Sequence, residues 1–506
     1  MNCGISGYKE AEWNFKEASA CFDGKTLKLS TGLVERVWRL EADGLATLSF
    51  RNLASGFELI PQDAPIACDW NIFMISGGGR HCNFLGVDAS VVEASILTSD
   101  HLLVTARFQY PESKTELHYS ICAYPGVPGF RTQVSLVAME EIPSGEKGTA
   151  RLPSWLTGAY TERICADLGG LERFAFGYYC DSQHRFHTDM PILREDHRKG
   201  FVGKREIYDW ANGLALENST GAGVLLVKES HKCVNQSGID SGAFVLRDNA
   251  VMVTGLGLSS LYGDKLFWLR NGKPLSAWAN WSILYEEGAD GRQFALKRLD
   301  RARFPFRQER DTLVMANTWG SRKQDAIEEG NLLKEIDSCA DLGIDLLQVQ
   351  LTIQDVDRSD FAGVYGHAYC FAITMMGIPL FFQETNLLSQ NTRMELKPLI
   401  KLYKNHREKI LSGFVRPIGD EPDNASITGF LCRSGESGEG YLTVFREAES
   451  KQTKAVLKLP DLNGMKLVFE NLLNAAKMEF EDAGIVEFEI PKPASFLFLK
   501  YVNLIV

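Results

Sequence analysis

Apolar and polar side chains alternate along most of the first 305 residues. The alternation is regular over residues 104–110, 117–123 and 130–136, where the side chains of one face are mainly apolar. Two further apolar stretches flank Asp43-Gly44, a strong signal for a tight β-hairpin. Because neighbouring side chains of a strand point to opposite faces, this pattern predicts antiparallel sheets with one buried face. We therefore expect residues 1–305 to form a large N-terminal β-sandwich with almost no helix.

Strand and helix patterns alternate along the chain from residue 306 onwards. Residues 313–316 are a short apolar strand pattern, residues 325–342 have helical periodicity, and residues 344–349 are a second strand pattern. Gly343 is the residue type that commonly ends a helix. The helical stripe that we expect to be buried consists of Ile327, Leu332, Leu333, Ile336 and Cys339.

The same alternation of element types continues to about residue 412. A helix near 369–376, a strand at 378–382 and a helix from about 393 to 411 are predicted, with Pro398 marking the first turn of the last helix. A β-α-β order implies parallel strands joined by right-handed crossovers. Residues 306–412 are therefore predicted to be a parallel α/β segment.

Residues 413–506 return to the period of two. Tight turns such as Asn463-Gly464 separate the strand patterns, which predicts a small C-terminal antiparallel β-domain. The alternating stretches are residues 441–446, 455–459, 466–470, 485–490 and 496–501.

Composition narrows the class of protein. The 506 residues include 54 Lys+Arg and 65 Asp+Glu, a net charge of −11, with 45% hydrophobic residues. This suits a globular protein with large cores, and the acidic balance argues against nucleic acid as a partner. No stretch approaches the ~18 apolar residues of a membrane helix, and the N-terminal residues do not resemble a signal peptide. The 11 Cys show no paired spacing, so we expect a reducing, cytoplasmic location without membrane attachment.

Polar side chains follow the predicted parallel strands where each strand ends. Asn317 and Trp319 follow the first strand, Gln348 and Gln350 close the second, and Glu384 follows the third. Ligands of parallel α/β architectures bind beyond the carboxyl ends of the strands. A Trp beside amide and carboxylate groups suits a sugar, which stacks one face on the ring and needs paired donors and acceptors for its hydroxyls. We predict a carbohydrate site at these five residues; the alternative is that Trp319 caps the strand layer and the glutamines are ordinary loop residues.

Motifs of the middle segment resemble one family. The run Asn317-Thr318-Trp319-Gly320-Ser321 begins a strand-helix-strand unit, and GHAYCFA (366–372), PLFFQE (379–384) and LKPLIKLYKNHRE (396–408) follow in order. The segment thereby resembles the first and last parts of the catalytic barrel in the α-galactosidase and melibiase family of glycoside hydrolases. The resemblance implies a large N-terminal β-sandwich, a (β/α)8 barrel and a small C-terminal β-domain. It also implies retaining hydrolysis of terminal α-galactosides, with no metal and no cofactor.

The implied barrel does not fit the available length. A (β/α)8 barrel takes about 200 to 250 residues, whereas residues 306–412 number 107 and predict three strands. The resemblance implies a carboxylate pair after strand 2 and catalytic aspartates after strands 4 and 6, but Gln350 runs directly into Leu351-Thr352. Retaining glycosidases need two carboxyls about 5 Å apart. We therefore expect that most of the barrel is missing between Gln350 and about Phe361, that no catalytic residue can be assigned, and that hydrolysis is impaired.

The expected fold class is multidomain β plus α/β. It comprises the N-terminal β-sandwich (1–305), an incomplete (β/α) barrel-like segment (306–412) and the C-terminal β-domain (413–506). Three parallel strands cannot close a barrel, so open backbone edges remain and we expect a homo-oligomer.

Three hypotheses on function stay open. The chain is an active exo-glycosidase that uses local carboxylates such as Asp357 and Glu384, a non-catalytic carbohydrate-binding or regulatory protein, or a defective truncated product. Weaker candidate sites, for which ordinary loops are the favoured interpretation, are a His-x-x-His metal motif at His184 and His187, a loop with Arg194, Asp196, His197 and Arg198 beside the sugar, and a glycine-rich anion-binding turn at 76–80.

Overall fold

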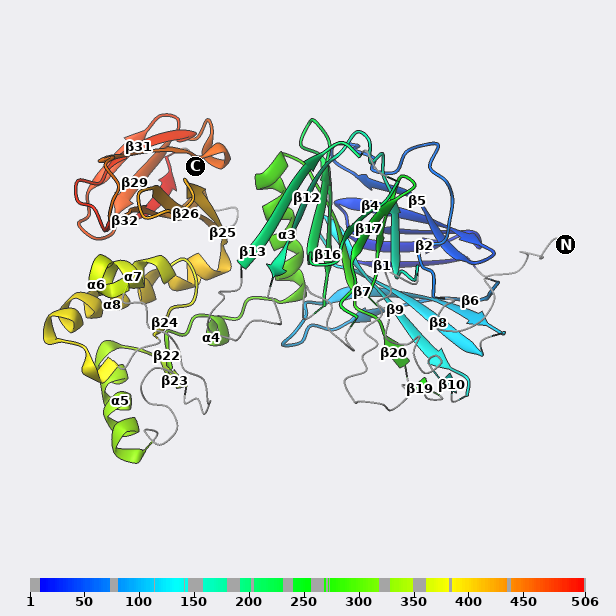
Figure 1. The fold of residues 1–506 in the computed structure, drawn as a ribbon, viewed down its shortest axis with the longest axis horizontal. Coiled ribbons are helices and arrows are strands. Elements are labelled where there is room, and N and C mark those ends of the chain that lie inside the picture. Colours follow the sequence, from blue (N-terminus) through cyan, green and yellow to red (C-terminus); the bar gives the residue numbers. More distant parts are fainter. Residues whose placement is uncertain are drawn as a thin grey trace. The chain divides into compact units, whose positions relative to one another are not determined.

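The chain consists of two compact units, Met1–Pro305 and Phe306–Val506, and Figure 1 labels many of their helices and strands. The predicted boundary at residue 412, between a second and a third domain, stays a prediction. The computed structural model describes residues 10–72, 81–112, 114–140, 142–143, 158–179, 192–201, 204–230, 240–255, 268–269, 272, 274–317, 328–348, 361–381, 385–434 and 438–504.

The N-terminal unit is built on a ten-stranded antiparallel sheet. In spatial order its strands are β13 (Ile192–Lys199), β12 (Glu172–Tyr179), β15 (Gly213–Glu217), β16 (Gly223–Lys228), β21 (Asn280–Tyr285), β9 (Gly129–Ala138), β8 (Thr115–Ala123), β7 (His101–Tyr110) and β6 (Asn83–Val92), and β20 (Pro274–Ser276) pairs with β9.

Smaller antiparallel sheets complete this unit. A five-stranded sheet contains β1 (Ala11–Phe15), β2 (Ala18–Phe22), β3 (Thr26–Ser30), β4 (Val34–Glu41) and β5 (Gly44–Asn52). A four-stranded sheet contains β11 (Glu162–Cys165), β18 (Ala250–Val253), β17 (Phe244–Arg247) and β14 (Glu206–Tyr208), and β10 (Ile142–Pro143) pairs with β19 (Trp268–Leu269).

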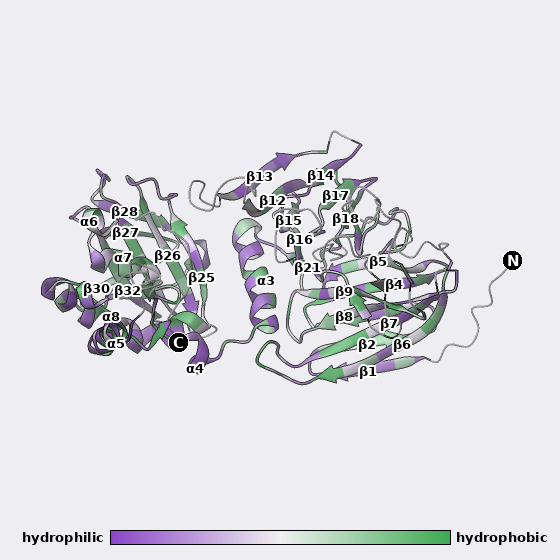
Figure 2. Ribbon diagram, turned by 60° about the horizontal axis from the view of Figure 1, so that its bottom comes forward, coloured by the Kyte–Doolittle hydropathy of each residue, from purple (hydrophilic) through white to green (hydrophobic). Residues whose placement is uncertain are grey.

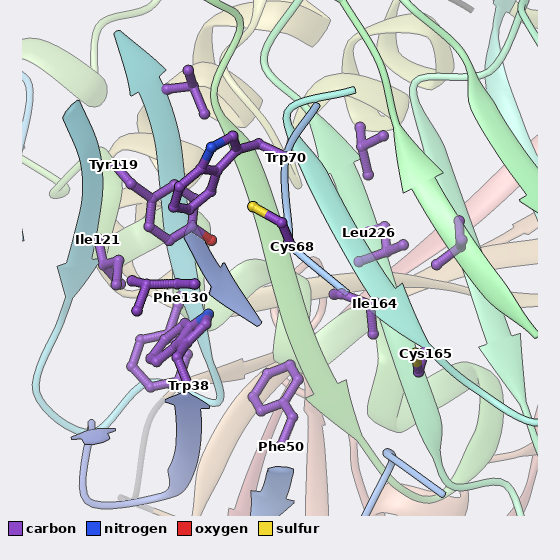
Figure 3. Packing of buried hydrophobic residues seen from close by; sticks show 14 of the residues in the cluster. Trp38, Phe50, Cys68, Trp70, Tyr119, Ile121, Phe130, Ile164, Cys165 and Leu226 are labelled. Atoms are coloured by element: carbon purple, nitrogen blue, oxygen red, sulfur yellow. The ribbon is translucent and has the colours of Figure 1, made fainter. Parts of the chain in front are cut away.

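An apolar core joins the inner faces of these sheets. Trp38 of β4 and Phe50 of β5 pack on Phe130 of β9, with ring centroids 6.2 and 6.0 Å apart. The ring of Trp70 lies 4.9 Å from that of Tyr119 of β8 (Figure 3). Along β7, β8 and β9, buried and half-buried residues alternate, as the period of two predicts. The expectation of a large antiparallel β-sandwich is confirmed.

The hairpin predicted at Asp43-Gly44 joins β4 to β5, with Glu41 opposite Gly44. Gly44 has a φ of 144°, and a Cβ at this position would lie 2.5 Å from Cζ2 of Trp70 and 2.6 Å from Sγ of Cys68. The turn therefore requires glycine both for its backbone conformation and for the close approach of the core.

The expectation of almost no helix in this unit is wrong for α3 (Gly288–Arg303). Ala295 and Leu299 are its buried residues, and they pack with Trp281 and Ile283 on the face of the ten-stranded sheet opposite the main core. The helix carries hydrophilic residues along much of its length (Figure 2). Because its buried stripe is so narrow, the helical period is weak in the sequence.

The second unit begins with a three-stranded parallel sheet. β22 (Met315–Asn317) lies between β23 (Leu346–Gln348) and β24 (Leu380–Phe381), and both pairings are parallel, as predicted from the β-α-β order. The helices of this segment are α4 (Gln308–Asp311), α5 (Glu329–Leu342), α6 (Phe361–Tyr365), α7 (His367–Thr374), α8 (Gln390–Ser412) and the 3-10 turn η2 (Thr385–Leu387).

The buried face of α5 differs from the predicted stripe. Leu333 and Ile336 are 54% and 49% exposed, so their expected burial is wrong. Cys339 is buried as predicted, and the other residues that α5 buries are Glu335, Ser338 and Leu342, at helical spacing from it. Gly343 ends the helix with a φ of 79°, as predicted.

The position of Pro398 also differs from expectation. It lies inside α8, not in the first turn. The helix begins after Ser389, whose hydroxyl accepts a hydrogen bond from the Thr392 amide at 3.1 Å and so caps the N-terminus. Leu399 and Tyr403 are buried on the same helix, so packing offsets the backbone hydrogen bond that proline cannot donate.

The C-terminal part of this unit is antiparallel, as predicted. Helices α7 and α8 cover a face of its larger sheet, because Tyr369 and Tyr403 share an apolar core with Tyr441, Phe445 and Phe498. The larger sheet contains β25 (Phe414–Gly419), β26 (Ile427–Ser434), β27 (Glu439–Arg446), β32 (Ser495–Asn503), β29 (Leu467–Asn471) and β30 (Lys477–Phe480). β28 (Lys454–Lys458) pairs with β31 (Ile485–Glu489), and η3 (Pro460–Leu462) is a short turn.

Candidate functional site

Two of the predicted site residues meet at the carboxyl ends of adjacent strands. Asn317 ends β22 and Gln348 ends β23, and the parallel register places them opposite each other. The Nδ2 group of Asn317 donates a hydrogen bond to Oε1 of Gln348 at 3.0 Å. Asn317 is buried and Gln348 is exposed, so the pair connects the strand layer to the surface.

The other predicted site residues lie outside the described part of the chain. These are Trp319, Gln350 and Glu384, together with the alternative carboxylate Asp357, the histidines His184 and His187, and the glycine-rich residues 76–80.

A network that the sequence did not predict holds the chain after β24. Glu335 of α5 is buried, and its carboxylate accepts hydrogen bonds from the backbone amides of Thr385 and Asn386 at 2.6 and 3.2 Å. Arg393 of α8 donates from Nη1 to the carbonyl oxygen of Thr385 at 2.9 Å. The signal in the sequence was Glu335 itself, a carboxylate at helical spacing from Cys339 and Leu342.

Other carboxylates of the segment serve ion pairs between elements. Asp345 precedes β23 and accepts hydrogen bonds from the Val314 amide, Lys404 and Arg407 at 3.0, 2.5 and 2.6 Å. Burial opposes ionisation, but these donors outweigh it and lower the pKa of Asp345. Asp341 pairs with Arg393 and Lys397. Both groups are therefore held as charged structural partners.

The segment with Arg194, Asp196, His197 and Arg198 is a strand and not the predicted loop. It forms β13, at an edge of the ten-stranded sheet. Arg194 stacks over the ring of Trp210 at 4.2 Å, and the ring of His197 stacks on that of Phe174 at 4.2 Å. These contacts bind the strand to its own unit.

Among the residues that the structure describes, no group of three or more His, Cys, Asp and Glu side chains is arranged to hold a metal ion. No helix in the described ranges is both long enough and apolar enough to cross a membrane.

The comparisons with known proteins give a match at the level of structure. No protein-family model and no curated protein matches the sequence. The galactosidase domain of the alpha-galactosidase-sucrose kinase AgaSK superposes with a TM-score of 0.65 at 10% identity, covering 95% of this chain and 99% of that chain. The chain has the fold of GH36 alpha-galactosidases. The resemblance inferred from the motifs is thereby confirmed for the fold.

Two further structures with this GH36 fold agree. The alpha-galactosidase AgaA from Geobacillus stearothermophilus has a TM-score of 0.62 at 10% identity, covering 94% of this chain and 100% of its own. The alpha-galactosidase from Lactobacillus brevis has a TM-score of 0.65 at 7% identity, covering 96% and 99%. Variants of AgaA have been crystallised with 1-deoxygalactonojirimycin, raffinose and stachyose.

Proposed function

We propose that the chain binds terminal α-galactoside-type sugars at the carboxyl ends of β22, β23 and β24, with little or no hydrolysis. The observation that carries the proposal is the Asn317–Gln348 pair at the ends of two parallel strands. It occurs in a chain with the fold of GH36 alpha-galactosidases, and AgaA variants of that fold are seen with raffinose and stachyose.

The chemistry of the pair suits a sugar hydroxyl. An amide side chain offers both a donor and an acceptor, and Gln348 uses Oε1 toward Asn317 while its side chain is exposed. Its NH2 group is thus oriented by a buried partner and available to a ligand. Trp319 is proposed as the stacking surface, and Gln350 and Glu384 as further hydrogen-bonding groups.

The proposal of impaired catalysis rests on the carboxylates and on the length of the segment. A retaining mechanism needs a nucleophile and an acid/base about 5 Å apart. Glu335, Asp341 and Asp345 are engaged in contacts between helices, turns and strands. The 107 residues of 306–412 are about half of what a complete barrel takes. An active exo-glycosidase that uses Asp357 and Glu384 is the competing function, and a defective truncated product is the third.

We also propose a homo-oligomer and a cytoplasmic location. The exposed apolar side chains of Leu333, Ile336 and Leu346 support self-association of the second unit. The eight cysteines in the described residues are free thiols, which supports a reducing compartment.

Galactose binding followed by ligand-observed NMR tests the function. We expect a millimolar Kd, equivalent to about −4 kcal/mol. Gln348→Ala should weaken binding by about five-fold, the value of one hydrogen bond of about 1 kcal/mol. Gln452→Ala removes an exposed glutamine that precedes β28 and is the matched control. Wild-type protein that gives no galactose or raffinose signal, or equal signals from Gln348→Ala, would contradict the site.

A further inference from the structure

Helix α5 carries an apolar stripe on the face that points away from the core of its own unit. Leu333 and Ile336 are 54% and 49% exposed, and Ala340 is exposed as well. The opposite face packs inward, with Glu335 and Leu342 buried. Neighbouring apolar side chains that stay in water commonly mark an interaction surface. The spacing of the stripe and the charges beside it indicate what that surface binds.

The stripe has the spacing of a coiled-coil seam. The steps from Leu333 to Ile336 and from Ile336 to Ala340 are three and four residues, which is the alternation that aligns the apolar side chains of two packed helices. In such a pair, each side chain of the seam enters a gap between side chains of the facing helix. A stripe this narrow therefore fits a second helix.

The charges beside the stripe indicate that the second helix is another copy of α5. Lys334 and Asp337 are exposed on the same flank of Leu333, and in the described part of the chain neither forms an ion pair. In an antiparallel pair with Leu333 of one copy opposite Ile336 of the other, Lys334 of each copy comes near Asp337 of the other. A two-fold interface must be self-complementary, and this arrangement of charges is.

We propose that the exposed face of α5 is a dimerisation surface, on which two copies of this chain pack their α5 helices antiparallel about a two-fold axis. This inference rests on the proposed homo-oligomer and names its interface. The helix has 14 residues and is about 21 Å long, so one helix pair buries less than the standard interface of about 1,600 Å². We therefore expect a weak dimer, with a Kd of about 10–100 µM.

Sedimentation equilibrium over a concentration series that spans this Kd measures the association. Leu333→Glu and Ile336→Glu each place a charge in the centre of the interface and should raise the dimer Kd at least about ten-fold. Ile485→Glu is the matched control, because Ile485 of β31 is 63% exposed and lies opposite Lys458 of β28. This variant should associate as wild type does. Circular dichroism checks that each variant keeps its helix content.

Charge reversal tests the antiparallel arrangement. Lys334→Glu alone and Asp337→Lys alone each create two like-charge contacts, because the symmetry repeats every contact, and each should weaken association about five-fold at low salt. An equimolar mixture of these two variants should associate about as strongly as wild type, because both contacts of the mixed dimer again join opposite charges. The double variant Lys334→Glu/Asp337→Lys should recover association for the same reason.

Each contrary outcome has a distinct meaning. A wild-type chain that stays monomeric well above about 100 µM would refute both the homo-oligomer and this interface. A wild-type oligomer that Leu333→Glu and Ile336→Glu leave intact would refute the interface but not the homo-oligomer. Charge-reversed variants that do not recover on mixing would overturn the antiparallel pairing of the α5 helices. If a glutamate variant loses helix content, the mixture of charge-reversed variants decides.

Discussion

Lowering the pH from 7.5 to 5 should stabilise the N-terminal unit through a charged cluster in its core. Arg36 of β4 lies between Asp69 and Glu162 of β11, and all three side chains are buried. Asp69 also accepts hydrogen bonds from the indole of Trp38 at 2.9 Å and from the Thr47 amide at 3.0 Å. One guanidinium faces two carboxylates, so the cluster carries one excess negative charge in a buried site.

That excess charge determines the sign of the effect. Burial, only partly opposed by Arg36, raises the pKa of Asp69 from its ordinary 3.8 to about 6. Between these two values the folded state binds a proton that the unfolded state does not. The free energy of unfolding therefore increases as the pH falls through 6, opposite to the usual behaviour of a salt-bridged aspartate. The shift corresponds to about 3 kcal/mol over the full titration and to about 1 kcal/mol between pH 7.5 and 5.

Urea unfolding followed by tryptophan fluorescence measures this change, because eight of the nine tryptophans lie in residues 1–305. Asp69→Asn removes the titrating group and leaves Arg36 with Glu162 alone. Wild type should gain about 1 kcal/mol relative to Asp69→Asn between pH 7.5 and 5, while other titrating groups cancel in the difference. Parallel pH profiles of the two proteins, or a relative loss for wild type at pH 5, would refute the reasoning.

Three further predictions concern the second unit, residues 306–506. With an aryl α-galactoside the chain should show no appreciable turnover, whereas a rate near about one per second that Asp357→Asn or Glu384→Gln abolishes would favour the active exo-glycosidase. Light scattering after size exclusion should show self-association that Leu333→Glu reduces, and a wild-type monomer would contradict the oligomer. Ser389→Ala should lower the free energy of unfolding of this unit by about 1 kcal/mol in urea titrations followed by circular dichroism, and an unchanged value would contradict the capping role.

The parts of the fold that follow from local patterns could be predicted, and those that depend on tertiary packing could not. The strands β7, β8 and β9 have a period of two that the sequence displays directly. The helix α3 buries only Ala295 and Leu299, so its amphipathic signal is small. Pro398 disfavours a helix interior locally, but the capped start at Ser389 and the packing of Tyr403 outweigh that preference.

Some features of the candidate site could likewise be predicted from local patterns, and others depend on tertiary packing. The meeting of Asn317 and Gln348 could be predicted because in-register parallel strands place their ends together. The hydrogen bonds of Glu335 could not, because its partners Thr385 and Asn386 are 50 and 51 positions away in the sequence. Helical periodicity in a sequence is recognised from apolar residues. The buried stripe of α5 includes the charged Glu335, which such a pattern does not mark as buried.

The exposed apolar residues bear on the completeness of the barrel. β22 is the central strand of the described sheet, and its Ala316 and the preceding Val314 are buried. β23 and β24 are the outer strands of that sheet, and Leu346 in β23 and Ile378 just before β24 are 43% and 47% exposed. Parallel strands are ordinarily covered on both faces, so apolar exposure at the outer strands fits a sheet that has kept the residues of a larger barrel. That distribution supports our proposal that intervening strands are missing, because polar residues would be expected at the outer strands of a small α/β domain with its own complete core.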